Sequence, residues 1–368
     1  MRDLFFIIFC FLSAFDIKVK GVDNFFPDYM DLENTNCIKG IFVWLIIFCH
    51  KRSYGKNKNY KYLKIIGNLG QKVVSMFLFY SSFGICESIK KKGNNYAKTL
   101  KNKAFIIFLK TQIIILMFLL ANIFILQKKI TLQRYILSII LKLSLGNSNW
   151  FAFTIIIFYF YAYFSFSLAK NNIFLGIIII SLLCFLHEKF VFYYYYPKKK
   201  YAVDTILCFV IGFYYSIIKI HLDKIMMKND IFYFLILSIT ILIFYESSKI
   251  NNLFFISLSN AIFSLLVVFI SMKIKLKNDF LKFMNTHSYS IYLLQRLVMM
   301  IVYQKRIFIH SDFSQIFFEF SSIFCIASLF DKYASYLDKI FLKKTNIISK
   351  NNYIHIDNKN YISYNDKK

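Results

Sequence analysis

The chain has 368 residues, of which 58% are hydrophobic, and it carries a formal net charge of +27 at pH 7. Soluble domains are on average about 45–50% apolar, so one soluble core cannot hide this much apolar surface, and lipid is the solvent for the rest. The positive charge does not indicate a nucleic-acid partner, because the lysines lie in loops between apolar runs, as in Lys51–Lys64 and Lys90–Lys103. We therefore expect the chain to lie in a lipid bilayer and to bind no nucleic acid.

Apolar runs recur along the whole chain at lengths typical of membrane helices. Crossing a hydrocarbon layer of about 30 Å takes about 20 residues, and Trp150–Ala169 and Leu253–Met272 are uncharged runs of that length. The other runs, in chain order, are Leu4–Phe15, Ile38–Cys49, Leu69–Cys86, Ala104–Leu126, Ile136–Leu145, Ile173–Leu186, Ala202–Ile220, Ile231–Tyr245, Tyr289–Tyr303 and Phe317–Phe330. Because a span in lipid must satisfy its own backbone, the runs predict an all-α, polytopic integral membrane helix bundle with about ten or eleven transmembrane helices.

One membrane domain is expected to cover residues 1–345, with residues 1–30 forming a short hydrophobic segment and a loop. Residues 346–368 lose the apolar runs and are rich in Asn and Lys, which is typical of a polar, disordered tail. The seven cysteines show no C-x-x-C pattern and no metal-like spacing, so no metal site is expected.

Charge does not determine the orientation of the chain in the membrane. Cytoplasmic loops are usually enriched in Lys and Arg, yet the two basic loops Lys51–Lys64 and Lys90–Lys103 are separated by the single span Leu69–Cys86. The two loops cannot both be cytoplasmic if that span crosses the membrane.

Asp204 lies near the start of another span. A carboxylate is costly there unless it is paired, and Lys200 or His50 is a potential partner.

Lys39 and His50 bracket a short apolar run and share one face of its predicted helix. Eleven helical steps of about 100° return the chain to within about 20° of its starting face, roughly 16 Å further along the axis. A cation near one surface and an imidazole further along suit a catalytic site. The alternative is that Lys39 extends to the membrane interface and that His50 merely ends the helix beside Lys51 and Arg52.

The stretch Thr35–Ile41, followed by His50, resembles the first motif of the acyltransferase 3 family, in which Arg or Lys is followed by ten residues and then His. Members of this family are polytopic enzymes that acylate, and usually acetylate, carbohydrates of the bacterial envelope. In this sequence the motif residues are Lys39 and His50.

Further motifs extend the resemblance over about residues 28 to 330. Segments similar to family motifs are Met76–Ile85, Glu87–Gly93 with Tyr96 and Lys103, Trp150 with Phe151, and Ser288–Leu294. Four positions depart from the family pattern. Ser82 replaces a usual Gly, Lys101 and Lys103 stand where arginines are common, and Gln295 stands where many members have His. Lysine lacks the planar fork that binds phosphate through two hydrogen bonds.

The resemblance implies a membrane-bound O-acyltransferase in a bacterial inner membrane. It would move an acyl group, usually acetyl, from acyl-CoA to a hydroxyl of a cell-surface polysaccharide or lipid-linked glycan, with acetyl-CoA as co-substrate and no bound cofactor. His50 and Lys39 would be the catalytic residues, on a helix whose Lys39 end is cytoplasmic. The residues expected to bind donor or substrate are Ser81, Lys101, Lys103 and Trp150.

Two roles are open for His50. Neutral imidazole, with an ordinary pKa of about 6.5, removes a hydroxyl proton near neutral pH. Alternatively, His50 takes the acyl group itself and passes it on.

A different class of function is a transporter or flippase for a lipid-linked glycan or a small solute. Transporters often contain helices broken by Gly or Pro and two similar halves. This chain has 10 Gly and 2 Pro and no evident repeat, so the spacing of Lys39 and His50 favours the enzyme. A family member that has lost its activity is a third hypothesis.

Overall fold

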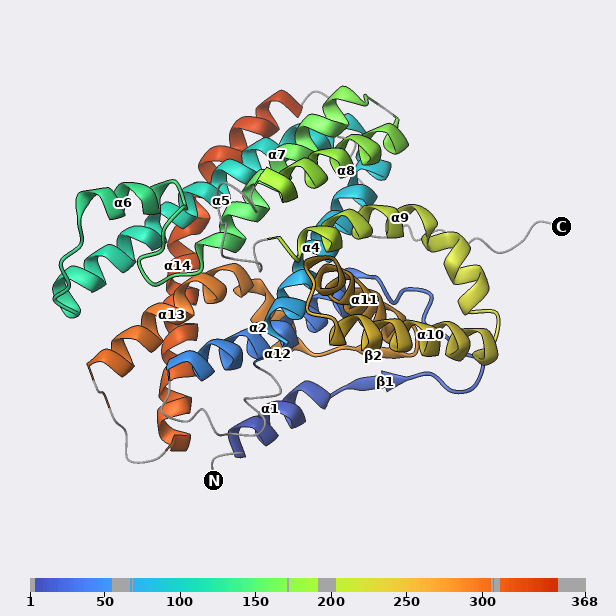
Figure 1. Cartoon of the computed structure of the whole chain (residues 1–368), viewed down its shortest axis with the longest axis horizontal. Helices are drawn as coiled ribbons and strands as arrows, with labels where there is room; N and C mark the ends of the chain where they lie inside the picture. The colour runs from blue at the N-terminus through green and yellow to red at the C-terminus, as the bar shows by residue number, and fades with distance from the viewer. Residues whose placement is uncertain are drawn as a thin grey trace.

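Nine helices among the described residues are long and apolar enough to cross a membrane. This computed structural model describes residues 4–54, 67, 69–170, 172–190, 203–305, 307 and 312–349. The nine are α2 (Leu32–Tyr54), α4 (Gly70–Lys92), α5 (Asn94–Leu120, continued by the π-helix η1, Ala121–Ile125), α7 (Asn149–Leu168), α8 (Ile173–Phe190), α9 (Ile206–Met226), α10 (Asp230–Lys249), α11 (Leu253–Ser271) and α14 (Asp312–Ser349). The predicted all-α, polytopic membrane bundle is confirmed (Figure 1).

The remaining helices explain the difference from the ten or eleven spans expected. α13 (Ser288–Gln304) has 17 residues, at the lower limit of about 17 for a span. α1 (Leu4–Ala14) has 11 residues and α6 (Leu132–Ile139) has 8, so the two apolar runs there form helices too short to cross. α12 (Asp279–Thr286) is also short, and α14 continues through the domain boundary expected at residue 345. Residues 350–368 of the predicted tail lie outside the described residues.

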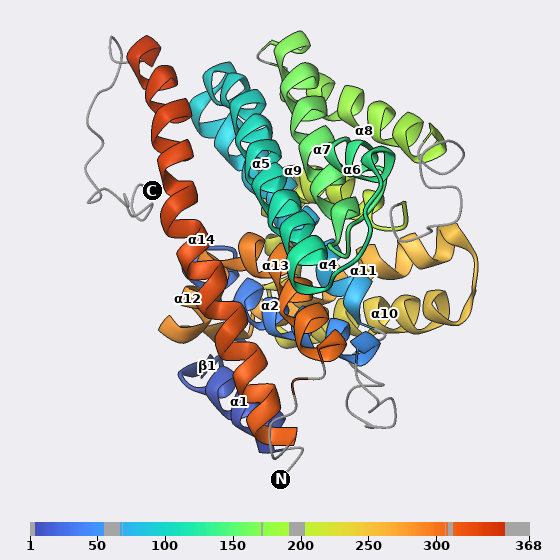
Figure 2. The same ribbon diagram turned by 90° about the vertical axis from the view of Figure 1, so that its left-hand side faces the viewer.

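The helices are arranged around α2 and α4, which lie in the middle of the bundle (Figure 1). α2 contacts α4, α12 and α13, and α4 and α5 pack against α9 and α7 respectively. α14 runs along one side of the molecule, from beside α1 to the opposite end (Figure 2). A two-stranded antiparallel sheet of β1 (Ile17–Val19) and β2 (Ile274–Leu276) lies at the end where α2 begins.

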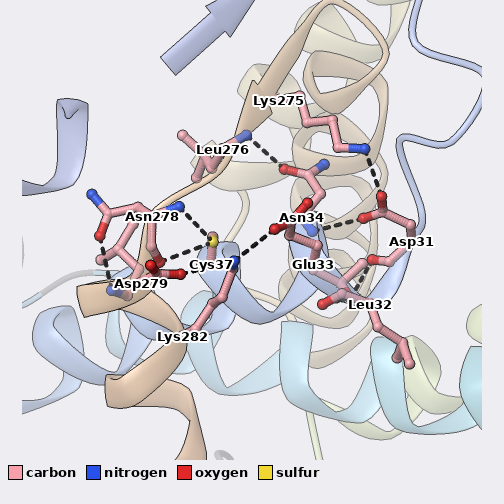
Figure 3. Close-up of polar contacts among 12 residues, drawn as sticks. Asp31, Leu32, Glu33, Asn34, Cys37, Lys275, Leu276, Asn278, Asp279 and Lys282 are labelled. Atoms are coloured by element: carbon pink, nitrogen blue, oxygen red, sulfur yellow. Dashed lines mark hydrogen bonds and ion pairs between the residues drawn. The ribbon is translucent and has the colours of Figure 1, made fainter. Parts of the chain in front are cut away.

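Polar contacts hold the start of α2 against β2 and the segment that follows it (Figure 3). Lys275 donates to Asp31 at 2.5 Å, and the Leu276 backbone N–H donates to Asn34 Oδ1 at 2.9 Å. Both contacts join residues far apart in the sequence, so they fix the position from which α2 enters the bundle.

α12 also holds the first turns of α2. Lys282 pairs with Glu33 at 2.6 Å, and a Cβ atom at Gly40 would overlap the Leu281 carbonyl oxygen. Gly40 therefore allows a closer approach of the two helices than any other residue would. It lies beside Lys39, so the same contact sets the position of that lysine.

A second close approach joins α4 and α9. A Cβ atom at Gly212 would overlap Ser82 Oγ and would lie 2.5 Å from the Phe79 carbonyl oxygen. Small residues allow membrane helices to pack this closely. Serine at position 82 is accommodated because the glycine lies on the opposite helix.

The interior between α4, α9 and α11 contains a carboxylate without a hydrogen bond. Asp204 is 1% exposed, and neither of its carboxylate oxygens has a hydrogen-bond partner among the described residues. Burial raises the pKa of Asp204 to about 7, while the nearby charge of Lys72 lowers it. Lys72 rather than His50 is thus the charge that acts on Asp204, and Lys200 lies outside the described residues.

We expect Gly212→Ala to lower the thermal unfolding midpoint of the purified protein in detergent. The added methyl group meets backbone as well as side-chain atoms, and overpacking of this kind costs about 1–3 kcal/mol. Gly84→Ala is the matched control on the facing helix, because no atom lies within 4 Å of its added Cβ. The control should leave the midpoint unchanged or raise it, since Gly in a helix costs about 1 kcal/mol relative to Ala. Equal effects of the two substitutions would contradict the close packing.

Asp204 makes stability depend on pH. An ordinary Asp has a pKa of about 3.9, so the folded chain binds this proton more tightly than the unfolded chain does. The resulting stability is fully present below about pH 4 and is lost as pH rises through about 7, by up to about 1.4 kcal/mol per pH unit. Asp204→Asn should therefore show a smaller loss between pH 5 and pH 8, measured as unfolding midpoints from intrinsic tyrosine and tryptophan fluorescence. An identical decline in both proteins would contradict this assignment.

Candidate active site

His50 lies in the wall of a cavity of about 720 Å³. The last turns of α2 and the first turns of α4, the segment 141–149, the start of α7 and one face of α13 enclose this space, which we call the His50 cavity. Its described lining residues are Ile46, Cys49, His50, Gly67, Gly70, Gln71, Val74, Leu141, Lys142, Leu143, Ser144, Asn147, Ser148, Asn149, Trp150, Tyr292 and Arg296. The helix carrying His50 is enclosed by other helices, and the imidazole borders a cavity.

α13 provides the immediate surroundings of the His50 ring. The Tyr292 ring lies 6.2 Å from it, centroid to centroid. The Gln295 side chain lies beside the imidazole, and Arg296 is close enough for its charge to act on it. His50 Nδ1 has no hydrogen-bond partner among the described residues, so no described group fixes the tautomer from that side.

His187 and His287 differ from His50 in this respect. His287 Nδ1 lies 2.6 Å from Asp331, and His187 Nδ1 lies 3.1 Å from the Tyr161 hydroxyl. Neither lines the His50 cavity.

A second cavity, of about 390 Å³, adjoins the first and has mostly apolar walls. We call it the apolar cavity. Ile46, Val74 and Tyr292 line both spaces, so these three side chains form the boundary between them. Lys103 and Lys110 of α5 also line the apolar cavity, and Lys110 pairs there with Asp338 at 2.9 Å.

Three of the four predicted binding residues line one of the two cavities. Ser81, which donates to the Tyr159 hydroxyl at 3.2 Å, and Lys103 line the apolar cavity. Trp150 lines the His50 cavity. Lys101 is exposed, with its ammonium 5.6 Å from the centre of the Tyr163 ring, and it lines neither space.

Lys39 lies on the face of α2 that the spacing predicts. Val43 and Ile46 continue that face toward His50, and both line the apolar cavity. Lys39 itself is half-buried and borders neither cavity, and no charged group among the described residues acts on it. The structure therefore keeps Lys39 and His50 on one face but about three turns apart, with the apolar cavity alongside the residues between them.

The segment 141–149 supplies polar groups to the His50 cavity that the sequence did not single out. The Asn122 amide on η1 donates to the Leu145 carbonyl oxygen at 2.9 Å, and the Asn149 amide donates to the Leu143 carbonyl oxygen at 2.5 Å. Gly146 adopts φ 125°, which L-residues with a side chain rarely adopt. These features hold the segment in a folded-back conformation beside Trp150.

Arg296 is the other functional candidate that sequence reasoning missed. It follows directly after the motif Ser288–Leu294 and Gln295. A lone cation inside an apolar run is by itself a signal of function in a membrane protein, and that signal was available in the sequence.

Among the residues that the structure describes, no group of His, Cys, Asp or Glu side chains could hold a metal ion. No family model matches this chain, and no curated protein and no solved structure matches it either.

Proposed function

We propose that this multi-pass membrane protein is an O-acyltransferase of the bacterial inner membrane. It would transfer an acyl group, in the simplest case acetyl from acetyl-CoA, to a hydroxyl of an envelope polysaccharide or lipid-linked glycan. The observation that carries the proposal is the position of His50, in the wall of a polar cavity that adjoins a separate apolar cavity with lysines in its lining. A transferase needs two substrates to meet at one catalytic group, and this arrangement offers a space for each.

The apolar cavity suits the donor. Its walls fit the acyl chain and the uncharged arm that carries the thioester, while Lys103 and Lys110 offer charge to phosphates. Lys110 is already paired with Asp338, so a phosphate would have to compete with that carboxylate. Lys39, further along the same face of α2, would add positive charge on the donor side.

The His50 cavity suits the acceptor, because hydroxyl and amide side chains line it. Ser148, Asn147 and Asn149 offer hydrogen bonds to sugar hydroxyls. An acceptor placed there would present a hydroxyl to His50, with the Ile46, Val74 and Tyr292 boundary between it and the donor.

The reaction requires one proton to move. As the acceptor oxygen bonds to the acyl carbonyl carbon, the bond from that carbon to the donor sulfur breaks, and His50 takes the hydroxyl proton and returns it to the departing thiolate. In the alternative with a covalent carrier, an imidazole nitrogen first takes the acyl group and the acceptor oxygen then removes it. Both routes need a neutral imidazole that the donor and the acceptor can both reach.

His50→Ala should abolish acyl transfer while the protein remains inserted and folded. The loss of general-base catalysis alone costs about 10²–10⁴-fold in rate. The measurement is transfer of labelled acetyl from acetyl-CoA into glycan by membranes that contain equal amounts of each variant. His221→Ala, at an exposed position of α9, is the matched control and should keep the wild-type rate. A wild-type rate from His50→Ala would remove His50 from the mechanism.

Lys103→Ala should raise the KM for acetyl-CoA with a smaller effect on kcat. The ammonium lines the apolar cavity and is held by the Tyr96 hydroxyl at 3.0 Å, so its loss weakens donor binding more than the chemical step. Lys98→Ala removes an exposed lysine from the same helix and should leave both constants unchanged. A fall in kcat at constant KM would place Lys103 in the chemical step instead.

A further inference from the structure

The charged side chains around the His50 cavity are all of one sign. Arg296 and Lys142 line it, and its described lining contains no Asp or Glu. A separate cavity of about 220 Å³, lined by Leu145 and Gly146 of the same segment, is also lined by Lys128 and Arg134 and likewise has no acidic residue among its described lining. The sequence agrees, because residues 51–66 and 127–149, which flank this region in the chain, contain no Asp or Glu.

Arg296 is the central cation of this region. It is half-buried in the middle of α13, and its Nε and Nη1 groups donate to the hydroxyls of Tyr54 at 3.2 Å and Ser148 at 3.4 Å. Both acceptors are neutral, and the structure gives Arg296 no carboxylate partner among the described residues. By contrast Lys51, a buried cation of α2, pairs with Glu319 at 2.6 Å.

A half-buried guanidinium without a carboxylate is costly in a membrane protein, and such groups usually mark a binding site. Its planar fork is suited to two parallel hydrogen bonds with a carboxylate or a phosphate. A cavity lined by charge of one sign also concentrates ligands of the opposite sign. The neutral donors at Ser148 and Asn147 would complete the coordination of an oxyanion.

We infer that Arg296, together with Lys142 and the amides of segment 141–149, forms an anion-binding subsite in the His50 cavity. The acceptor glycan then carries a negative charge near the hydroxyl that is acylated, as a sugar carboxylate or a sugar phosphate. The assignment of this anion-binding subsite to the acceptor rests on the proposed function, whereas the subsite itself rests on the charges around the cavity.

The test is a binding measurement that requires no turnover. The full chain is purified in lipid nanodiscs, and its thermal unfolding midpoint is followed during titration with glucuronate, glucose 1-phosphate or glucose. One or both anionic sugars should raise the midpoint, and glucose at equal concentration should not. The anion that gives the larger shift distinguishes a carboxylate acceptor from a phosphate acceptor.

Arg296→Gln should weaken binding of the effective anion by about 10- to 100-fold, the range expected for the loss of a charge-assisted hydrogen bond. Arg296→Lys keeps the charge without the fork and should bind with intermediate affinity, which also controls for misfolding of the glutamine variant. Lys249→Gln removes an exposed cation at the end of α10 and should bind as wild type does. An undiminished anion shift in Arg296→Gln, an equal shift with glucose, or no shift with either anion would overturn the inference.

Failure of the anion site and failure of the proposed function give different results. His50→Ala should retain the anion-induced shift, because Arg296 supplies the binding. If that variant binds the anion and also transfers acetyl at the wild-type rate, the proposed mechanism fails and the anion site stands. If transfer depends on His50 but Arg296→Gln leaves anion binding intact, the mechanism stands and the anion site fails.

Discussion

The attachment of α2 to β2 and α12 determines where every part of the candidate site can lie. Lys275 and Lys282 hold the acidic first turn of the helix, and Gly40 allows its backbone to touch that of Leu281. From this fixed start, a regular helix carries His50 about three turns beyond Lys39. The distance from these contacts at the start of α2 to the imidazole is therefore set by helical geometry.

The residues between Lys39 and His50 separate two chemically different spaces. Three side chains belong to the walls of both cavities: Ile46 of α2, Val74 of α4 and Tyr292 of α13. Apolar walls with lysines lie on one side of this boundary, and amides, hydroxyls and a guanidinium lie on the other. A single helix thus borders an environment suited to a thioester and one suited to a polar, anionic acceptor, with His50 in the wall of the polar space.

The packing that forms these walls depends on small residues in a few places. Gly212 allows α9 to approach Ser82 of α4, and this holds α4 in the position where Val74 reaches both cavities. The opposite face of α4 carries Lys72 toward Asp204, which has no hydrogen bond among the described residues. One helix therefore contributes both to the candidate site and to the charge that acts on the buried carboxylate of Asp204.

The sequence by itself determined the class of structure and the face of α2 that matters. Long uncharged runs such as Leu253–Met272 can be stable in lipid only as helices, and an eleven-residue spacing places Lys39 and His50 on one side of a helix whatever surrounds it. Sequence also pointed to Ser81, Lys103 and Trp150, which line the cavities, and to Lys101, which does not. Only the tertiary structure decided which of these residues share a space, because that depends on contacts between helices far apart in the chain. It brought Arg296 of α13 and the segment 141–149 to His50, and it left Lys39 outside both cavities. It also made Lys72 the charge that acts on Asp204. No local pattern encodes those neighbours, since they result from how whole helices pack against α2 and α4.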